Sequence, residues 1–351
     1  MMEQKKLISL TVLTVVIVAV TAFAVSQYRQ GTALQINRIA LDPQWEEKAE
    51  QVFRVELDGP DGTVTLWREP AADPSENDQW RVAERHDYAA DNGKIWQLIS
   101  EYGELELVEP RTADPELYER LFLRDRSQPD AQSLAVSFAD GNGNLLSAAL
   151  FGKPRKTSGQ GERQFFLRRV GEAQTWVAAG RLDPARLPSA WLNREVIDIS
   201  QQRVREVTIN HPGKQLSRVA REDSQQPMQL QTAPDGQQPD ETAVNAIAYG
   251  LQKLPLVDVN TVDEAGLDWD DVIEVQFATF DGLTVTVRVQ SKDLGIVARF
   301  SAVGEGDSAA EARELNARLS PWVFVLPNHT VSTFTRTPEE LLISGDDHSD
   351  H

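Results

Sequence analysis

The sequence has 351 residues, with 35 lysines and arginines against 54 aspartates and glutamates, so its formal net charge is −19. This charge argues against nonspecific binding to nucleic acid and against binding to an anionic membrane surface, because both depend on basic residues. The absence of cysteine excludes disulfides, thiolate metal sites and thiol nucleophiles. A composition of 40% hydrophobic and 25% charged residues predicts a folded body of about two domains.

The first feature along the chain is an uncharged apolar run over residues 7–25. At about 1.5 Å per helical residue it is long enough to cross a hydrocarbon core of about 30 Å. Lys5 and Lys6 precede the run, so residues 1–30 are predicted to be a short cytoplasmic tail and a transmembrane anchor, with the body in the periplasm. We therefore expect a single-pass inner-membrane protein.

The alternative is a signal peptide that is cleaved after Ala24, which would leave a soluble periplasmic protein. The sequence Ala22-Phe23-Ala24 has the small-x-small form that signal peptidase cleaves. The apolar run is longer than the roughly 7–15 residues of a usual signal core, which favours the retained anchor.

After a predicted tether over residues 31–50, the chain repeats itself at an offset of 149 residues. Asp91 precedes an apolar helical stripe and a strand, and Asp240 precedes the same pattern. The paired stripes are Ile95, Leu98, Ile99 and Tyr102, and Val244, Ile247, Ala248 and Leu251. A helix N-cap, stripe and strand that stay in register without a gap predict two tandem units, over residues 51–199 and 200–343.

Antiparallel sheet is predicted for most of each unit. Alternating residues on either side of the turn 59–62 predict a hairpin over residues 53–68, with a counterpart at 204–219. A second hairpin over residues 134–151 corresponds to residues 273–289.

Both units are expected to close on similar segments, Leu187 to Trp191 and Leu319 to Trp322. The expected fold class is α+β, with one N-terminal transmembrane helix, two tandem repeats of antiparallel sheet with a few packed helices, and a polar tail over residues 344–351.

No motif for catalysis, a cofactor or a metal occurs in the sequence: it has no phosphate-binding glycine loop, nucleophile elbow or paired-histidine helix. We therefore expect no enzyme, no catalytic or metal-binding residues and no cofactor. Two tryptophans are the candidate contacts for a partner or ligand. Trp67 lies on the opposite strand face from Val64 and Leu66, and Trp80 begins the next strand. The alternative for Trp67 is a core position under the helix.

Several short segments resemble the bacterial domain of unknown function 4340 family. They are Trp80-x-Val82, Tyr88 to Asp91 and Leu105 to Thr112. The resemblance covers nearly the whole exported part in two copies and is strongest from Phe53 to Asp114. The family's Gly-Leu-Asp-x-Pro-like turn is kept in part at Gly266 to Asp268, whereas Tyr118 to Leu121 lacks the glycine. The resemblance implies a membrane-anchored, ABC-transporter-associated protein and carries over no catalytic residues.

The expected function is that of a non-enzymatic, membrane-anchored periplasmic accessory or scaffold subunit of an ABC-type transport or cell-envelope complex. Its expected partners are the membrane, through the N-terminal helix, and an integral membrane permease with its ATPase, but no nucleic acid. The alternative is a periplasmic module that captures a glycan, lipid or peptide between the two repeats. From Gly31 onward the net charge is −21, which favours proteins or neutral ligands as partners.

Overall fold

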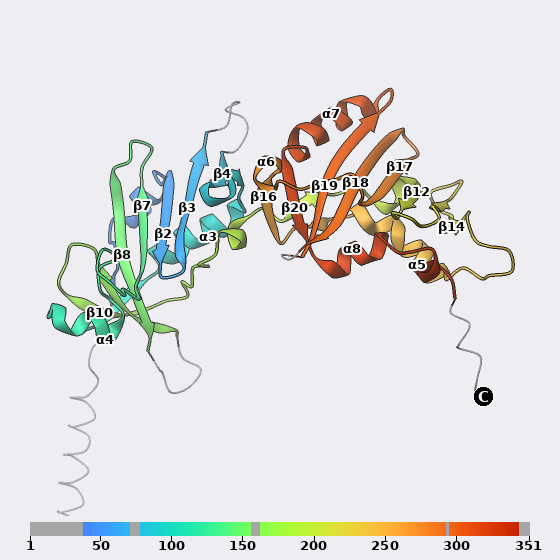
Figure 1. The fold of residues 1–351 in the computed structure, drawn as a ribbon. Helices are drawn as coiled ribbons and strands as arrows, with labels where there is room; N and C mark the ends of the chain where they lie inside the picture. The colour runs from blue at the N-terminus through green and yellow to red at the C-terminus, as the bar shows by residue number, and fades with distance from the viewer. Residues whose placement is uncertain (1–37, 71–77, 156–161, 293–294, 344–351) are drawn as a thin grey trace, which may run out of the picture.

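The computed structural model describes residues 38–70, 78–155, 162–292 and 295–343 (Figure 1). These residues form a mixed α+β structure in which antiparallel sheets dominate and helices are few. The predicted anchor and the polar tail lie outside the described residues. Among the helices of the described ranges, none is both long and apolar enough to cross a membrane.

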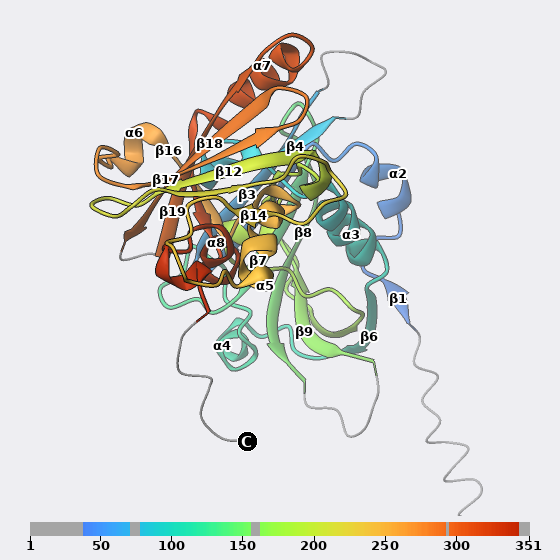
Figure 2. The ribbon, with the colours of Figure 1, turned by 90° about the vertical axis from the view of Figure 1, so that its right-hand side faces the viewer.

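The first unit contains a ten-stranded antiparallel sheet in the order β1-β6-β10-β9-β8-β7-β2-β3-β4-β5. Its strands are β1 (Ile39–Ala40), β2 (Arg54–Gly59), β3 (Gly62–Glu69), β4 (Gln79–Val82), β5 (Tyr88–Ala89), β6 (Glu106–Pro110), β7 (Leu134–Ala139), β8 (Leu145–Pro154), β9 (Gln164–Arg169) and β10 (Thr175–Ala179). Its α-helices are α2 (Trp45–Ala49), α3 (Asn92–Gly103) and α4 (Tyr118–Leu121). Figure 2 shows α2 and α3 lying next to each other beside this sheet.

The second unit contains an eight-stranded antiparallel sheet in the order β14-β13-β12-β17-β18-β19-β20-β16. Its strands are β12 (Val204–Asn210), β13 (Ser217–Ala220), β14 (Gln229–Leu230), β16 (Asp258–Thr261), β17 (Ile273–Thr279), β18 (Leu283–Lys292), β19 (Gly295–Gly304) and β20 (Trp322–Leu326). Its α-helices are α5 (Glu241–Ala246), α6 (Val262–Ala265), α7 (Ser308–Leu319) and α8 (Asn328–Phe334). Strands β11 (Glu195–Ile197) and β15 (Leu254–Pro255) pair separately.

The two large sheets share one strand order. Read from β4, the first sheet runs β4-β3-β2-β7-β8-β9-β10-β6, and the second runs β14-β13-β12-β17-β18-β19-β20-β16. The registers agree at the centre, because Val55 lies opposite Phe138 in the first sheet and Val207 lies opposite Phe277 in the second. Each strand of one series therefore has a counterpart at the same place in the other.

The start of the main helix is also built in the same way in both units. Asp91 and Asp240 cap α3 and α5 by accepting the N–H of the third residue beyond them. Their own N–H groups donate to the carbonyls of Trp191 and Leu341. The match predicted between Trp191 and Trp322 is therefore wrong, because Trp322 begins β20 and Leu341 holds the equivalent hydrogen-bonded position.

The predicted tether over residues 31–50 is wrong from Ile39 onward, because this part of the chain belongs to the first unit. Strand β1 pairs with β6, and Trp45 of α2 is only 5% exposed. The Trp45 ring centroid lies 4.7 Å from the rings of Tyr102 and Phe138. The sequence around Trp45 shows no apolar pattern that predicts a core position, because α2 buries only its first residue and the residues that follow are charged.

We expect Trp45→Ala to lower the free energy of unfolding by about 3–5 kcal/mol, because it leaves a cavity beside two core aromatic rings. Urea denaturation measures the loss. The matched control is Trp96→Ala, because Trp96 is 41% exposed and should cost much less. Equal losses for the two variants would contradict the placement of Trp45 in the core.

Candidate functional site

The two predicted contact residues lie in different surroundings. Trp80 is 0% exposed and packs edge-on against Trp96 of α3, with 6.1 Å between ring centroids. The prediction of Trp80 as a contact residue is therefore wrong, because the helix covers its side of the sheet. Trp67 is half-buried, and its indole N–H donates to Asp87 at 2.6 Å. Trp67 stays a candidate.

Asp87 belongs to a turn that reaches from the first unit to the second. Arg85, the last residue of η1 (Ala83–Arg85), donates through Nε and Nη2 to both carboxylate oxygens of Asp258 in β16, at 2.6 and 2.8 Å. This hydrogen bonding raises the pKa of Arg85. A two-point pair of this kind fixes the direction as well as the distance between its partners.

The backbone of this turn has an unusual conformation. His86 and Asp87 have φ angles of 54° and 59°, so two successive non-glycine residues lie in the left-handed region. Such a conformation persists where side chains hold it. His86 Nε2 lies 2.7 Å from a carboxylate oxygen of Glu264 in the second unit, and Trp67 holds Asp87. Trp67 therefore supports the turn that presents Arg85 and His86.

Aromatic packing joins the two units beside this turn. Tyr88 of β5 is 8% exposed and lies edge-on to Trp322 and Phe324 of β20, with ring centroids 5.0 and 6.2 Å away. Burial raises the pKa of Tyr88 to about 12, so it carries no charge at neutral pH. The buried apolar residues of both units consequently form one continuous cluster.

Backbone pairing adds a third connection. Strands β11 and β15 pair Glu195 with Pro255 and Ile197 with Leu254. Arg318 of α7 also donates to the carbonyl of Val196 at 2.7 Å. The junction thus combines a charged pair, an aromatic contact and a short strand ladder. We take it as the candidate functional site, because it sets the position of one unit relative to the other.

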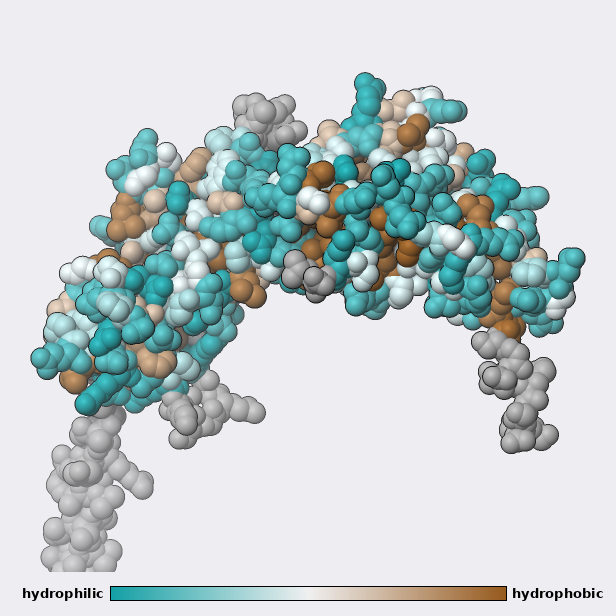
Figure 3. Space-filling model, viewed as in Figure 1, coloured by the Kyte–Doolittle hydropathy of each residue, from teal (hydrophilic) through white to brown (hydrophobic). Residues whose placement is uncertain are grey.

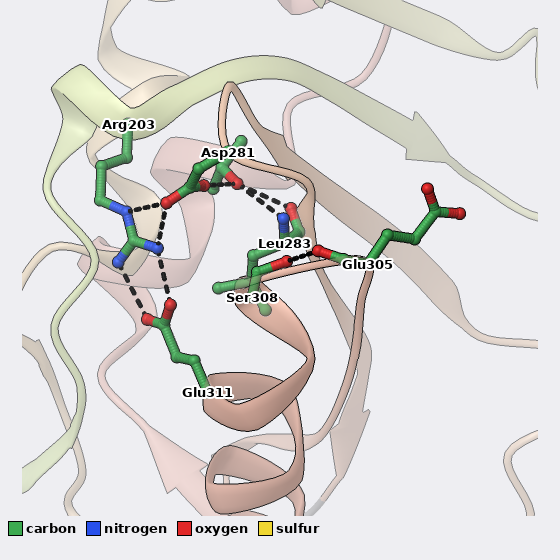
Figure 4. Close-up of polar contacts among 7 residues, drawn as sticks. Arg203, Asp281, Leu283, Glu305, Ser308 and Glu311 are labelled. Carbon is green, nitrogen blue, oxygen red and sulfur yellow. Dashed lines mark hydrogen bonds and ion pairs between the residues drawn. The ribbon is translucent and has the colours of Figure 1, made fainter.

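A second polar cluster lies where α7 begins at the end of the second sheet (Figure 4). Arg203 donates to Asp281 at 2.7 Å and to both carboxylate oxygens of Glu311, at 2.9 and 2.7 Å. The hydroxyl of Thr279 donates to Asp281 and accepts the N–H of Leu283 at 2.9 Å. The cluster connects the start of β12, the turn between β17 and β18, and α7.

These contacts fix the charge state of the cluster. The Thr279 hydroxyl, followed by the Arg203 guanidinium, holds the pKa of Asp281 below its ordinary value. The hydrogen bond to Glu311 in turn raises the pKa of Arg203. Neither group is poised to exchange a proton near neutrality, so the arrangement suits a structural clamp rather than acid-base catalysis.

Among the described residues, an open pocket of about 520 Å³ lies between α5 and α8, with Tyr249 and Thr333 in its wall. Two smaller open pockets also lie within single units. One has a volume of about 210 Å³ and lies between α3 and the segment 182–191, with Lys94, Leu98 and Trp191 in its wall. The other has a volume of about 320 Å³ and lies beside the Arg203 cluster, with Glu222 and Phe280 in its wall. Each is a potential small-molecule site that is lined by residues of one unit alone.

No local pattern in the sequence identifies the junction residues. Arg85 and Asp258 are 173 positions apart, and charged residues are too common in this chain for a pair to be chosen by eye. His86 likewise faces Glu264, a residue far away in the sequence, across the junction. The junction residues come together only in the folded structure, where the strand orders bring β5 and β16 to the ends of their sheets.

Tyr88→Ala is expected to uncouple the two units, because it removes the ring that connects the first core to Trp322 and Phe324. Calorimetry should then resolve two thermal transitions where the wild type shows one. The control Tyr249→Ala, at a side chain that is 53% exposed, should keep a single transition. A wild-type protein that already unfolds in two separate steps would count against the coupling.

The Arg203 cluster predicts a pH-dependent contribution to stability. A carboxylate with a lowered folded-state pKa stabilises the fold above its unfolded pKa of about 3.9, and this stabilisation disappears as the pH falls through the folded-state value. Asp281→Asn should therefore lower the free energy of unfolding at neutral pH and differ little from the wild type near about pH 2. Urea titrations at both pH values measure this, with the exposed Asp235→Asn as control. A deficit that persists in acid would refute the assignment.

The comparisons with known proteins bear on the same region. The family model described as "Domain of unknown function (DUF4340)" matches residues 80–268, which is more than half of the chain. The match runs from β4 to just past α6, and so includes the η1 turn, β11, β15 and the partners of Arg85 and His86. No curated protein and no solved structure matches the chain. The match is a single one that begins at Trp80, rather than two copies that begin near Phe53. The resemblance to the family itself is confirmed, and the chain belongs to the DUF4340 family.

Proposed function

We propose that the protein is a membrane-anchored periplasmic accessory or scaffold subunit of an ABC-type transport or cell-envelope complex. The observation that carries this proposal is the junction, where the Arg85–Asp258 pair and the Tyr88 contacts connect two units of the same strand order. A scaffold acts by holding surfaces at a set separation, and such a junction does this without any chemical step.

The shape of the molecule supports the same proposal. The space-filling view in Figure 3 shows the two units as an arch that is hollowed on its lower side. We attribute the shared strand order to tandem duplication, with repeats over residues 51–199 and 200–343, and with β1 and α2 as additions to the first unit. A duplicated unit offers two related surfaces, one on each side of the arch, to a partner that spans both.

The proposal places the body outside the inner membrane and assigns residues 7–25 as its anchor. A permease and its ATPase are the proposed partners. The part of the chain that follows the anchor contacts the permease. The net charge of −21 beyond Gly31 favours basic or neutral partner surfaces. We favour this function over ligand capture between the repeats, because Tyr88, Trp322 and Phe324 occupy the space where the two units meet.

Affinity purification of the full-length protein after mild detergent extraction tests the proposal. We expect a permease and its ATPase to be recovered with the wild type. Tyr88→Ala should lose them while the protein stays in the membrane fraction, because the relative position of the two units is no longer fixed. Tyr249→Ala is the control and should retain them. Repeated recovery of the wild type without other subunits would argue strongly against the proposal.

A further inference from the structure

An exposed aromatic side chain at one end of the first unit contacts one cation and follows a second one closely in the sequence. Phe122 directly follows α4 and is 42% exposed. Lys153 Nζ lies 5.7 Å from the centroid of the Phe122 ring, and Arg120 is exposed two residues before it. Within the part of the chain that the structure describes, neither Lys153 nor Arg120 forms an ion pair.

The backbone at Phe122 has a conformation that a large side chain rarely adopts. Its φ angle is 62°, in the left-handed region that asparagine or glycine adopts far more easily than phenylalanine. The neighbouring Tyr118 and Leu123, by contrast, are 6% and 0% exposed and form a small core cluster with Leu150. A bulky apolar residue at a strained, exposed position points to a contact outside the chain.

The charge around Phe122 differs from that of the chain as a whole. The adjacent Glu119 is paired with Arg124 at 2.7 Å. Glu109 at the end of β6 is paired with Arg155 at 2.6 Å and with Arg111 at 3.0 Å. Asp125, three residues after Phe122, is paired with Arg168. The acidic residues that remain close by in sequence are Glu116 of the η2 segment (Pro115–Leu117) and its N-cap Asp114. The net charge of −19 therefore does not describe this surface.

The position of this surface relative to the predicted anchor restricts its partner. Figures 1 and 2 place α4 in the lower part of the first unit, and Figure 2 places β1 there as well. The chain from the apolar run to β1 includes residues 26–37, which span at most about 43 Å at about 3.6 Å per residue. The end of the unit that carries β1 consequently stays within about 43 Å of the bilayer that holds the anchor.

We infer that Phe122, Arg120 and Lys153 form a membrane-contact surface on the periplasmic face of that bilayer. An aromatic ring is stable at the level of the lipid headgroups, and the flexible cationic side chains of Arg120 and Lys153 reach the lipid phosphates. This inference rests on the proposed function, because it requires the anchor at residues 7–25. The contact gives the body a second attachment and so sets the tilt of the arch over the membrane.

The test uses the absence of cysteine in the chain. Phe122→Cys introduces a single thiol, which is labelled with a fluorophore in the full-length protein reconstituted into phosphatidylcholine and phosphatidylglycerol vesicles. Lipids with a nitroxide on the headgroup quench only fluorophores at the membrane surface. The matched control is Val303→Cys in the second unit, at a side chain that is 69% exposed. We expect several-fold stronger quenching at position 122, and a decrease when Arg120→Gln and Lys153→Gln are added.

Vesicle flotation separates the two ways in which this experiment can fail. Full-length protein that does not float with vesicles would refute the anchor and with it the proposed function. Protein that floats, but whose label at position 122 is quenched no more than that at 303, would overturn this inference alone and make the α4 surface a site for a protein partner.

Thermal unfolding of the full-length protein checks that Phe122 is not simply a folding residue. Phe122→Asn should leave the unfolding midpoint unchanged or raise it, because asparagine fits the left-handed backbone. Leu123→Ala should lower the midpoint, because Leu123 is fully buried. An equal decrease for both variants would show that the ring is needed for folding and would overturn the inference.

Discussion

The junction between the two units is the constraint on which the rest of the structure depends. Tyr88 is buried against β20 only if the η1 turn keeps its left-handed residues, and that turn is held by Asp258 and Glu264 on one side and Trp67 on the other. Burial of apolar surface supplies the attraction, whereas the Arg85 pair supplies direction. Neither alone fixes how two separate sheets lie relative to each other.

Local patterns in the sequence predicted the local structure well. The stripe behind Asp91 became α3, with its four apolar residues buried, and the alternation around the turn 59–62 became the hairpin of β2 and β3. These patterns succeed because a single helix or hairpin is specified by side chains a few positions apart. The second copy of the helix was predicted less well, since it passes from α5 into the 3₁₀ segment Ile247–Leu251.

Errors arose where burial depends on distant parts of the chain. Trp45 lies in a charged segment, and it is buried because it packs against Tyr102 and Phe138. Trp80 is buried because α3 covers it, and the position of that helix cannot be known from the strand alone. The junction pair was invisible for the same reason, because its members approach only after both sheets have formed. The net charge has the same weakness, because it is a sum over the whole chain and does not describe the surroundings of Phe122.

The position of β5 and β16 at the ends of their sheets has a consequence for biogenesis. The first unit is synthesised before the second, and its terminal strand β5, at residues 88–89, meets its neighbours on β16 and β20 only after residues 258–326 have followed. During that interval the ring of Tyr88 has no cover from the second unit. A half-synthesised chain therefore carries an apolar sheet end that is open to wrong partners, and the second unit, which completes the arch, also ends this period of vulnerability.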